Sequence, residues 1–172
     1  MKLIFAAHSC NHFLKPGEAI ISPDPIMVST ILGSCVAVTM YSPAKGIGAI
    51  CHAMLPLNLK QDNDLHYVDT AARYLYQKMQ EHGGHTDMII KLFGGAQVLA
   101  GGYSTTAKLS VGEQNIIQAH KTLNQLGLVI TNADIGGTLG RKLHFSMKTG
   151  DVYLRKLKLR GVASTCAEGE MG

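Results

Sequence analysis

The sequence predicts an α+β fold built as a single domain, with several β-hairpins and two long helices. Its 172 residues are enough to bury a core, and 46% of them are hydrophobic while only 16% are charged. Short apolar, β-branched runs separated by Gly, Pro and Ser predict strands, whereas two longer segments repeat apolar residues at helical spacing. This combination indicates a compact globular protein and excludes a disordered one.

The first third of the chain has the turn residues and apolar runs of a sheet. Strands are predicted at residues 19–22, 26–32, 35–41 and 47–55. Pro23 and Pro25 end the first strand, and a glycine turn at residues 33–34 separates the second from the third. The turn-prone residues 42–46 then predict a hairpin, which would bring the last two strands side by side.

Two helices and four further strands are predicted in the rest of the chain. The first helix covers residues 67–82 and ends at a pair of glycines, and the second covers residues 110–125 and opens with a capping box of Ser110 and Glu113. The strands lie at residues 88–93, 128–133, 142–147 and 152–157, the last two joined by a hairpin. We expect residues 1–160 to form the domain, with residues 161–172 as a disordered tail.

Cys35 and His52, both in the first third of the chain, suggest nucleophilic catalysis. Cys35 follows the glycine turn, where a side chain can be presented at the end of a sheet. Alternation along the strand places Ile50, His52 and Met54 on one face, and the hairpin could bring His52 beside Cys35. A thiol beside an imidazole forms a more nucleophilic thiolate, and the imidazole can later protonate a leaving group.

The same residue types also occur in purely structural and in metal-binding roles. A lone cysteine in an apolar strand is usually a small buried hydrophobe, and a lone histidine is often a core residue with its hydrogen bonds satisfied. A metal site is a sharper alternative, with candidate ligands Cys10, His12, Cys35, Cys51 and His52. No pair has the C-x-x-C spacing, and the adjacent Cys51 and His52 should point to opposite faces of a strand, so the sequence disfavours a metal site.

Charge and hydropathy narrow the partners and the compartment. The net charge is +4, and much of it lies in Arg141, Lys142, Lys148, Arg155, Lys156, Lys158 and Arg160. No aromatic platform is interleaved with these residues, so we expect a solvated strand face, or second an acidic protein partner, and no nucleic acid. The apolar run at residues 1–8 is too short for a signal peptide or a membrane span. The four cysteines could form disulfides in a secreted protein, but nothing in the sequence suggests that the protein is exported. We therefore expect a cytoplasmic protein without membrane insertion.

Five segments in order resemble one protein family. They are LGSCVAV at residues 32–38, HAMLP at 52–56, KLFGGA at 91–96, VGEQN at 111–115 and DIGGTLGRK at 134–142. These segments resemble those of the chemoreceptor glutamine deamidases, the CheD family. The resemblance extends roughly from Pro16 to Leu157, and five segments in the same order are specific where one would be weak. It implies a layered α/β sandwich with mostly antiparallel strands, whose catalytic geometry is related to that of bacterial toxin deamidases.

The resemblance also implies an activity. Members of the family are amidohydrolases that convert selected receptor glutamines into glutamate and ammonia, with no cofactor and no metal. By that resemblance Cys35 is the nucleophile and His52 is the acid and base. The family's third catalytic residue is a threonine that orients the histidine. Counting back from Cys35 puts Ser29 at that position, with its neighbour Thr30 as the alternative, because only one of the two can face His52 on a strand.

Partners follow from the same resemblance. Methyl-accepting chemoreceptors would be the substrates, and a CheC-type phosphatase would be a further partner in bacterial chemotaxis. Two other functions stay open: a chemotaxis adaptor that binds a receptor or a CheC-type phosphatase with little turnover, and a thiol amidase acting on a free small molecule. The presence of both Cys35 and His52 favours the enzyme over the adaptor.

Overall fold

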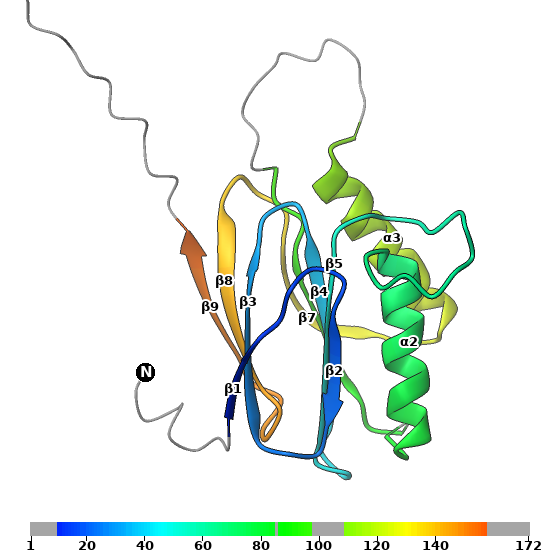
Figure 1. The fold of residues 1–172 in the computed structure, drawn as a ribbon, viewed down its shortest axis with the longest axis vertical. Coiled ribbons are helices and arrows are strands. Elements are labelled where there is room, and N and C mark those ends of the chain that lie inside the picture. Colours follow the sequence, from blue (N-terminus) through cyan, green and yellow to red (C-terminus); the bar gives the residue numbers. More distant parts are fainter. Residues whose placement is uncertain (1–9, 85, 98–108, 158–172) are drawn as a thin grey trace, which may run out of the picture.

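Two β-sheets and a pair of helices make up the fold (Figure 1). The computed structural model describes residues 10–84, 86–97 and 109–157, so the expected tail at residues 161–172 lies outside the described residues. The strands are β1 (Cys10–Phe13), β2 (Ala19–Ser22), β3 (Ile26–Leu32), β4 (Val36–Ser42), β5 (Ile47–Ala53), β6 (Ile89–Gly94), β7 (Ile130–Ile135), β8 (Gly140–Ser146) and β9 (Val152–Leu157). The helices are α2 (Val68–Glu81) and α3 (Val111–Gln125).

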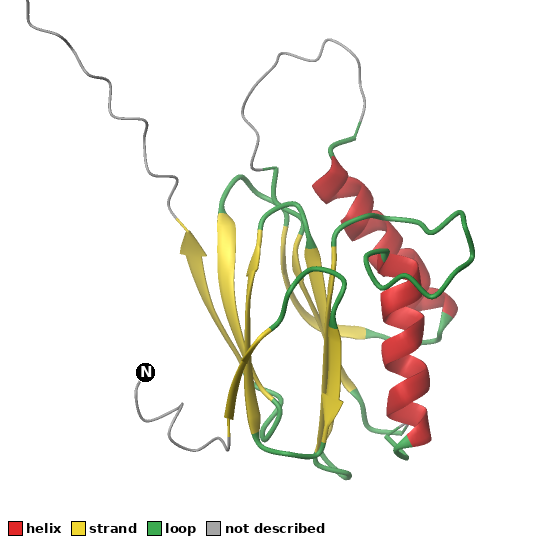
Figure 2. Cartoon of the chain, in the orientation of Figure 1, coloured by secondary structure: helices red, strands yellow, loops and turns green. Residues whose placement is uncertain are grey.

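The elements form three layers. The first sheet has the strand order β1-β3-β8-β9, and the second sheet has the order β2-β5-β4-β6-β7. The two sheets pack face to face, and both helices cover the other side of the second sheet (Figure 2). All neighbouring strands are antiparallel except the pairs β1–β3 and β6–β7. The predicted layered α+β fold with mostly antiparallel strands and two long helices is confirmed.

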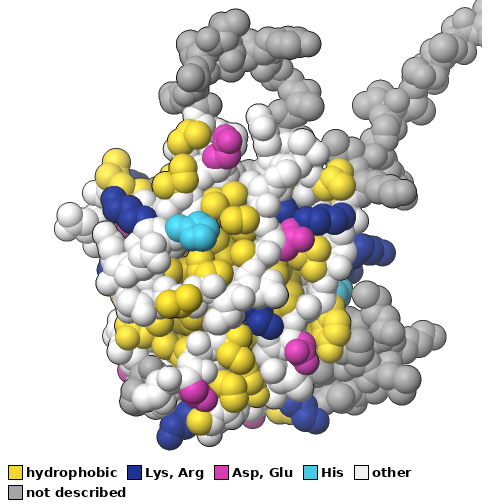
Figure 3. Space-filling model, turned by 180° about the vertical axis from the view of Figure 1, so that it is seen from behind, with side chains coloured by type: hydrophobic (Ala, Val, Ile, Leu, Met, Phe, Trp, Pro, Cys, Tyr) yellow, Lys and Arg dark blue, Asp and Glu magenta, His cyan; other side chains and the backbone are white. Residues whose placement is uncertain are grey.

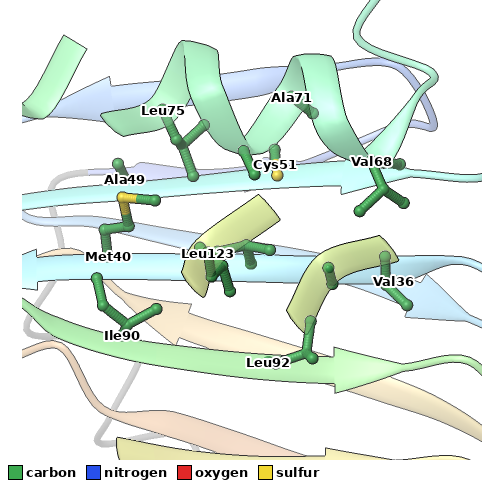
Figure 4. Packing of buried hydrophobic residues seen from close by; sticks show 14 of the residues in the cluster. Val36, Met40, Ala49, Cys51, Val68, Ala71, Leu75, Ile90, Leu92 and Leu123 are labelled. Carbon is green, nitrogen blue, oxygen red and sulfur yellow. The ribbon is translucent and has the colours of Figure 1, made fainter. Parts of the chain in front are cut away.

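The helix layer packs on the second sheet through the apolar stripe that its sequence predicts. In α2 the buried residues recur every three or four positions, at Val68, Ala71, Ala72, Leu75 and Met79. They lie against Val36, Met40, Ala49 and Cys51 of β4 and β5 (Figure 4). The larger of these side chains, such as Val68, Leu75 and Met79, stabilise the fold by about 1.5–3 kcal/mol each when fully buried.

The chain changes sheet between β3 and β4. Although they are consecutive, β3 pairs with β1 and β8, whereas β4 pairs with β5 and β6. The turn at Gly33 and Ser34 therefore carries the chain from the first sheet to the second. The two sheets bury a shared cluster against each other, to which β3 and β8 contribute Val28, Leu32, Leu143 and Phe145, and the second sheet contributes Ala37, Ile50 and Phe93.

One basic residue departs from the solvated face that its sequence predicts. Lys148, Arg155 and Lys156 are exposed as expected, whereas the side chain of Arg141 is only 1% exposed. Its guanidinium donates to Asp134 Oδ1 at 2.6 Å and to the Gly136 carbonyl at 2.7 Å. Arg141 thus joins β8 in the first sheet to the end of β7 in the second. On the face seen in Figure 3, the charged side chains are few and scattered among hydrophobic ones.

Removing the carboxylate that faces Arg141 should destabilise the fold. We expect Asp134→Asn to lower the free energy of unfolding by about 1–3 kcal/mol, because a buried guanidinium would lose its counter-charge while Asp134 itself is partly exposed. Lys156 also contacts Asp134, but its side chain is 43% exposed, so Lys156→Met should cost less than about 1 kcal/mol. Urea unfolding of both variants tests this, and equal midpoints for Asp134→Asn and the wild type would contradict it.

The same variant has a predictable pH dependence. Partial burial raises the pKa of Asp134, but its hydrogen bonds and charge interactions with Lys156 and Arg141 outweigh this and hold the pKa below the usual 3.8. A lowered pKa contributes stability that is fully present above 3.8 and is lost as the pH falls through the folded-state value. The difference in the free energy of unfolding between wild type and Asp134→Asn should therefore shrink only in strong acid.

Candidate active site

Cys35 lies in the turn between the sheets, and this turn is held by main-chain contacts. The Gly95 amide donates to the Cys35 carbonyl at 2.8 Å, and the Ala96 amide donates to the Gly33 carbonyl at 2.8 Å. A Cβ atom on Gly94, which has a φ of +107°, would lie 2.1 Å from the Cys35 carbonyl oxygen. Only glycine permits this approach. The glycine pair at the end of β6, Gly94 and Gly95, thus packs against backbone.

His52 projects from β5 into the layer between the two sheets. It pairs with Ala37 of β4, and with Ile50 it faces the first sheet, while Cys51 faces the helices. Cys35 precedes Ala37 by two residues and packs partly buried against the same cluster between the sheets. The β4–β5 register therefore places Cys35 and His52 near one another on the face that meets the first sheet. The imidazole is only 2% exposed.

A threonine from the opposite sheet holds the imidazole. Thr30 Oγ1 donates to the Leu14 carbonyl at 2.8 Å and lies 2.8 Å from His52 Nδ1. Because the single hydroxyl proton goes to Leu14, the hydroxyl oxygen accepts from His52, so the proton of the neutral ring is on Nδ1. The lone pair is then on Nε2, which is buried and without a hydrogen-bond partner among the described residues.

Ser29 does not reach His52, so the residue assignment based on counting back from Cys35 is corrected. Its hydroxyl lies 3.5 Å from the His12 carbonyl, on the opposite side of β3. Neighbouring strand residues face opposite ways, and Thr30 is the one that faces the second sheet together with Val28 and Leu32. The alternative residue, Thr30, occupies the position beside the imidazole.

Burial keeps both partners of the pair neutral. It lowers the pKa of His52 below the usual 6.5, although the Leu14 carbonyl and Glu18 act in the opposite direction. Burial also raises the pKa of the Cys35 thiol above the usual 9.0, against a smaller lowering from a backbone hydrogen bond. At neutral pH the resting pair is accordingly a thiol and a neutral imidazole, and a thiolate would form when His52 removes the proton.

A second histidine lies at the rim of the site. The His66 ring packs over Gly17, where a Cβ atom would lie 2.4 Å from it, and the Gly17 amide donates to the His52 carbonyl. Asp64 accepts a hydrogen bond from His66 Nδ1 at 2.6 Å and fixes the orientation of the ring. The loop between β5 and α2 therefore borders the site through His66.

Two further cysteines, Cys51 and Cys10, lie in the described part of the chain. Cys51 is buried under the helices, where burial raises its pKa to about 12, and Cys10 is exposed on β1. Within residues 10–84, 86–97 and 109–157, no three His, Cys, Asp or Glu side chains are grouped as metal ligands would be.

Comparison with known proteins identifies the family of this chain. The family model for CheD chemotactic sensory transduction matches residues 54–156. A relative from Maridesulfovibrio salexigens is 40% identical over 157 residues, which cover 85% of this chain and 91% of the relative. The chain belongs to the CheD family.

Further CheD relatives come from several organisms. The one from Maridesulfovibrio salexigens and one from Methanococcus maripaludis, 35% identical over 83% of this chain and 93% of its own length, are both named probable chemoreceptor glutamine deamidase CheD. A Geobacter sulfurreducens relative, 39% identical over 84% of this chain and 89% of its own, is named probable chemoreceptor glutamine deamidase CheD 2. No helix in the described part of this CheD chain is long and apolar enough to cross a membrane.

Sequence reasoning missed one polar residue of the site, Asn115 of α3. Its side chain is fully buried, and Nδ2 donates to the Ser34 carbonyl at 2.9 Å and to the Met54 carbonyl at 3.0 Å. A signal was present in the sequence: Gly112, Asn115 and Ala119 recur at helical spacing, which places an amide on the buried face.

The contact between Thr30 and His52 can be tested without substrate. We expect Thr30→Val to lower the free energy of unfolding by about 1–3 kcal/mol, since it leaves the Leu14 carbonyl and His52 Nδ1 unpaired without changing the side-chain shape. Ser29→Ala, on the opposite face of the same strand, should remain within about 0.5 kcal/mol of wild type. Nitrogen NMR of the His52 ring should detect loss of the Nδ1–H form in Thr30→Val only, and the same loss in Ser29→Ala would contradict the assignment.

Proposed function

We propose that this CheD protein is a chemoreceptor glutamine deamidase, hydrolysing side-chain amides of receptor glutamines to glutamate and ammonia. The observation that carries the proposal is the buried Thr30–His52 pair on the face that Cys35 shares. The names of the relatives support the substrate class. Cys35, His52 and Thr30 are the proposed catalytic and positioning residues, in a deamidase domain extending over residues 1–160.

The proposed reaction begins with a proton transfer. His52 Nε2 takes the proton of the Cys35 thiol as sulfur attacks the carboxamide carbon of glutamine. The resulting imidazolium gives this proton to the amide nitrogen, the carbon–nitrogen bond breaks, and ammonia departs. A thioester between Cys35 and the glutamine side chain remains. Nε2 then takes a proton from water, which attacks the thioester carbon. The thiol recovers the proton, and glutamate is released.

Thr30 would keep the imidazole in the reactive form. Its oxygen accepts from Nδ1–H, so Nε2 carries the lone pair that the first proton transfer requires. When His52 becomes an imidazolium, the same hydrogen bond to an oxygen backed by the Leu14 carbonyl lowers the energy of the charged ring. Thr30 therefore acts through His52 and is a positioning residue.

The turn provides donors for the oxyanion that forms during attack. The carbonyls of Gly33 and Ser34 are occupied by Ala96 and Asn115. In a trans peptide the N–H points opposite to the C=O, so the amides of Ser34 and Cys35 point away from those partners. The proposal takes these two N–H groups as the donors that stabilise the tetrahedral oxyanion.

The surroundings of the site favour a protein substrate over a free amide. Four exposed apolar side chains, Met54, Leu55, Leu57 and Leu59, follow β5 directly, and Leu59 is 83% exposed. The Met54 carbonyl shares the Asn115 amide with Ser34, so this segment begins beside the nucleophile turn. Clustered exposed apolar residues typically mark protein interaction sites. The proposal includes chemoreceptors as substrates in the cytoplasm, with a CheC-type phosphatase as the partner that family resemblance implies.

Replacing the nucleophile should abolish turnover while the fold persists. We expect Cys35→Ala to lower deamidation of receptor peptides by at least about 10²-fold, because no other group can form the thioester. Mass spectrometry of the peptides, together with ammonia release, measures the reaction. Cys10→Ala removes an exposed thiol and should keep wild-type turnover. Wild-type activity in folded Cys35→Ala would end the nucleophile assignment.

A neutral resting pair also predicts the pH profile. The lowered pKa of His52 keeps Nε2 largely unprotonated at pH 6.5. We therefore expect kcat/KM to fall only when the pH is lowered below that value. Because the pKa of Cys35 is raised, the rate of its alkylation by iodoacetamide should continue to rise with pH to values above 9.0. A preformed thiolate–imidazolium pair would instead give rapid alkylation already at neutral pH, and that result would contradict the neutral pair.

A further inference from the structure

Asn115 connects two segments that carry the proposed catalytic residues. Asn115 Nδ2 donates both of its hydrogens to main-chain carbonyls, which can only accept, so the amide nitrogen and not the oxygen faces them. One carbonyl belongs to Ser34, the residue before Cys35, and the other belongs to Met54, two residues after His52. A single amide therefore spans the gap between the nucleophile turn and the end of β5.

The position of Asn115 is built into the packing of α3. A Cβ atom on Gly112 would lie 2.5 Å from the Gly95 carbonyl oxygen, and one on Gly95 would lie 2.5 Å from Ile116. The first turn of α3 thus rests directly on the glycine pair that holds the Cys35 carbonyl. The capping box of Ser110 and Glu113 starts the helix at this level. Asn115 follows one turn later on the same buried face.

The buried amide of Asn115 is satisfied on one side only. Asn115 Oδ1 is buried and has no hydrogen-bond partner among the described residues. An apolar side chain would avoid this unpaired acceptor, but it would leave the Ser34 and Met54 carbonyls without the hydrogen bonds that Nδ2 donates. The bridge between these two carbonyls therefore accounts for a polar side chain at this buried position.

We propose that Asn115 is a positioning residue, which fixes the nucleophile turn relative to His52 and orients the peptide that links Ser34 to Cys35. The carbonyl of that peptide accepts from Asn115, and its N–H is the Cys35 amide, one of the two oxyanion donors. Holding one end of this peptide directs the other. The inference rests on the proposed deamidase function and adds a residue to it.

The test compares Asn115→Ala with Asn124→Ala, an exposed asparagine of the same helix. With turnover normalised to the folded fraction, Asn115→Ala should lower kcat on receptor peptides by about 10–10²-fold, since misplacing a reactive group costs up to that amount. KM should change little, because no substrate contact is removed. Asn124→Ala should match the wild type in both constants.

A second readout requires no substrate. Releasing the turn should expose Cys35, so its alkylation by iodoacetamide should become faster at pH 8 in Asn115→Ala than in wild type. If Asn115→Ala does not fold, Asn115→Ser provides the same test, because a serine hydroxyl is too short to span both carbonyls. An unchanged kcat or an unchanged alkylation rate in a folded variant would overturn the inference. An inactive wild type would overturn the deamidase proposal instead, and the alkylation rates alone would then decide the role of Asn115.

Discussion

One hydrogen bond across the interface between the sheets organises the candidate site. Thr30 reaches from β3 to His52 in β5 and is itself anchored to the Leu14 carbonyl. All three groups are buried in a layer that is otherwise apolar, where a polar group is tolerated only when it is paired. The spacing and register of the two sheets must therefore satisfy a bond of about 2.8 Å, which tolerates only a few tenths of an ångström.

Close main-chain contacts at three glycines position the turn that carries Cys35. Main chain approaches main chain at Gly94 against Cys35, and at Gly112 against Gly95. Each contact removes the space that a side chain would need and gives the turn a fixed backbone partner. The turn that carries Cys35 is thus positioned by peptide groups, whose geometry is stiffer than that of long side chains.

Much of this organisation could be predicted from the sequence. Periodicity identified both helices, including the Ser110 capping box, and alternation assigned His52 and Cys51 to opposite faces of β5. The choice between Ser29 and Thr30 could not be made in this way, because β3 has apolar residues on both faces: Val28 points inward, and Ile31, 48% exposed, points outward. Which face meets the second sheet depends on pairing with β8, more than 100 residues away. Asn115 was missed for a related reason, since its partners are carbonyl groups, which no sequence pattern marks.

The buried contacts of the site also constrain when it can exist. Its hydrogen bonds join residues 16, 22, 61 and 81 positions apart, so none can form within a single local element. Contacts of this separation form late, after the entropy of closing long loops has been overcome. A nascent chain that ends before α3 lacks the Asn115 amide that bridges Ser34 and Met54, and one that ends before β8 lacks the strand that pairs with β3. The candidate site is in this sense a property of the completed fold, and it can be assembled only when synthesis has passed β8.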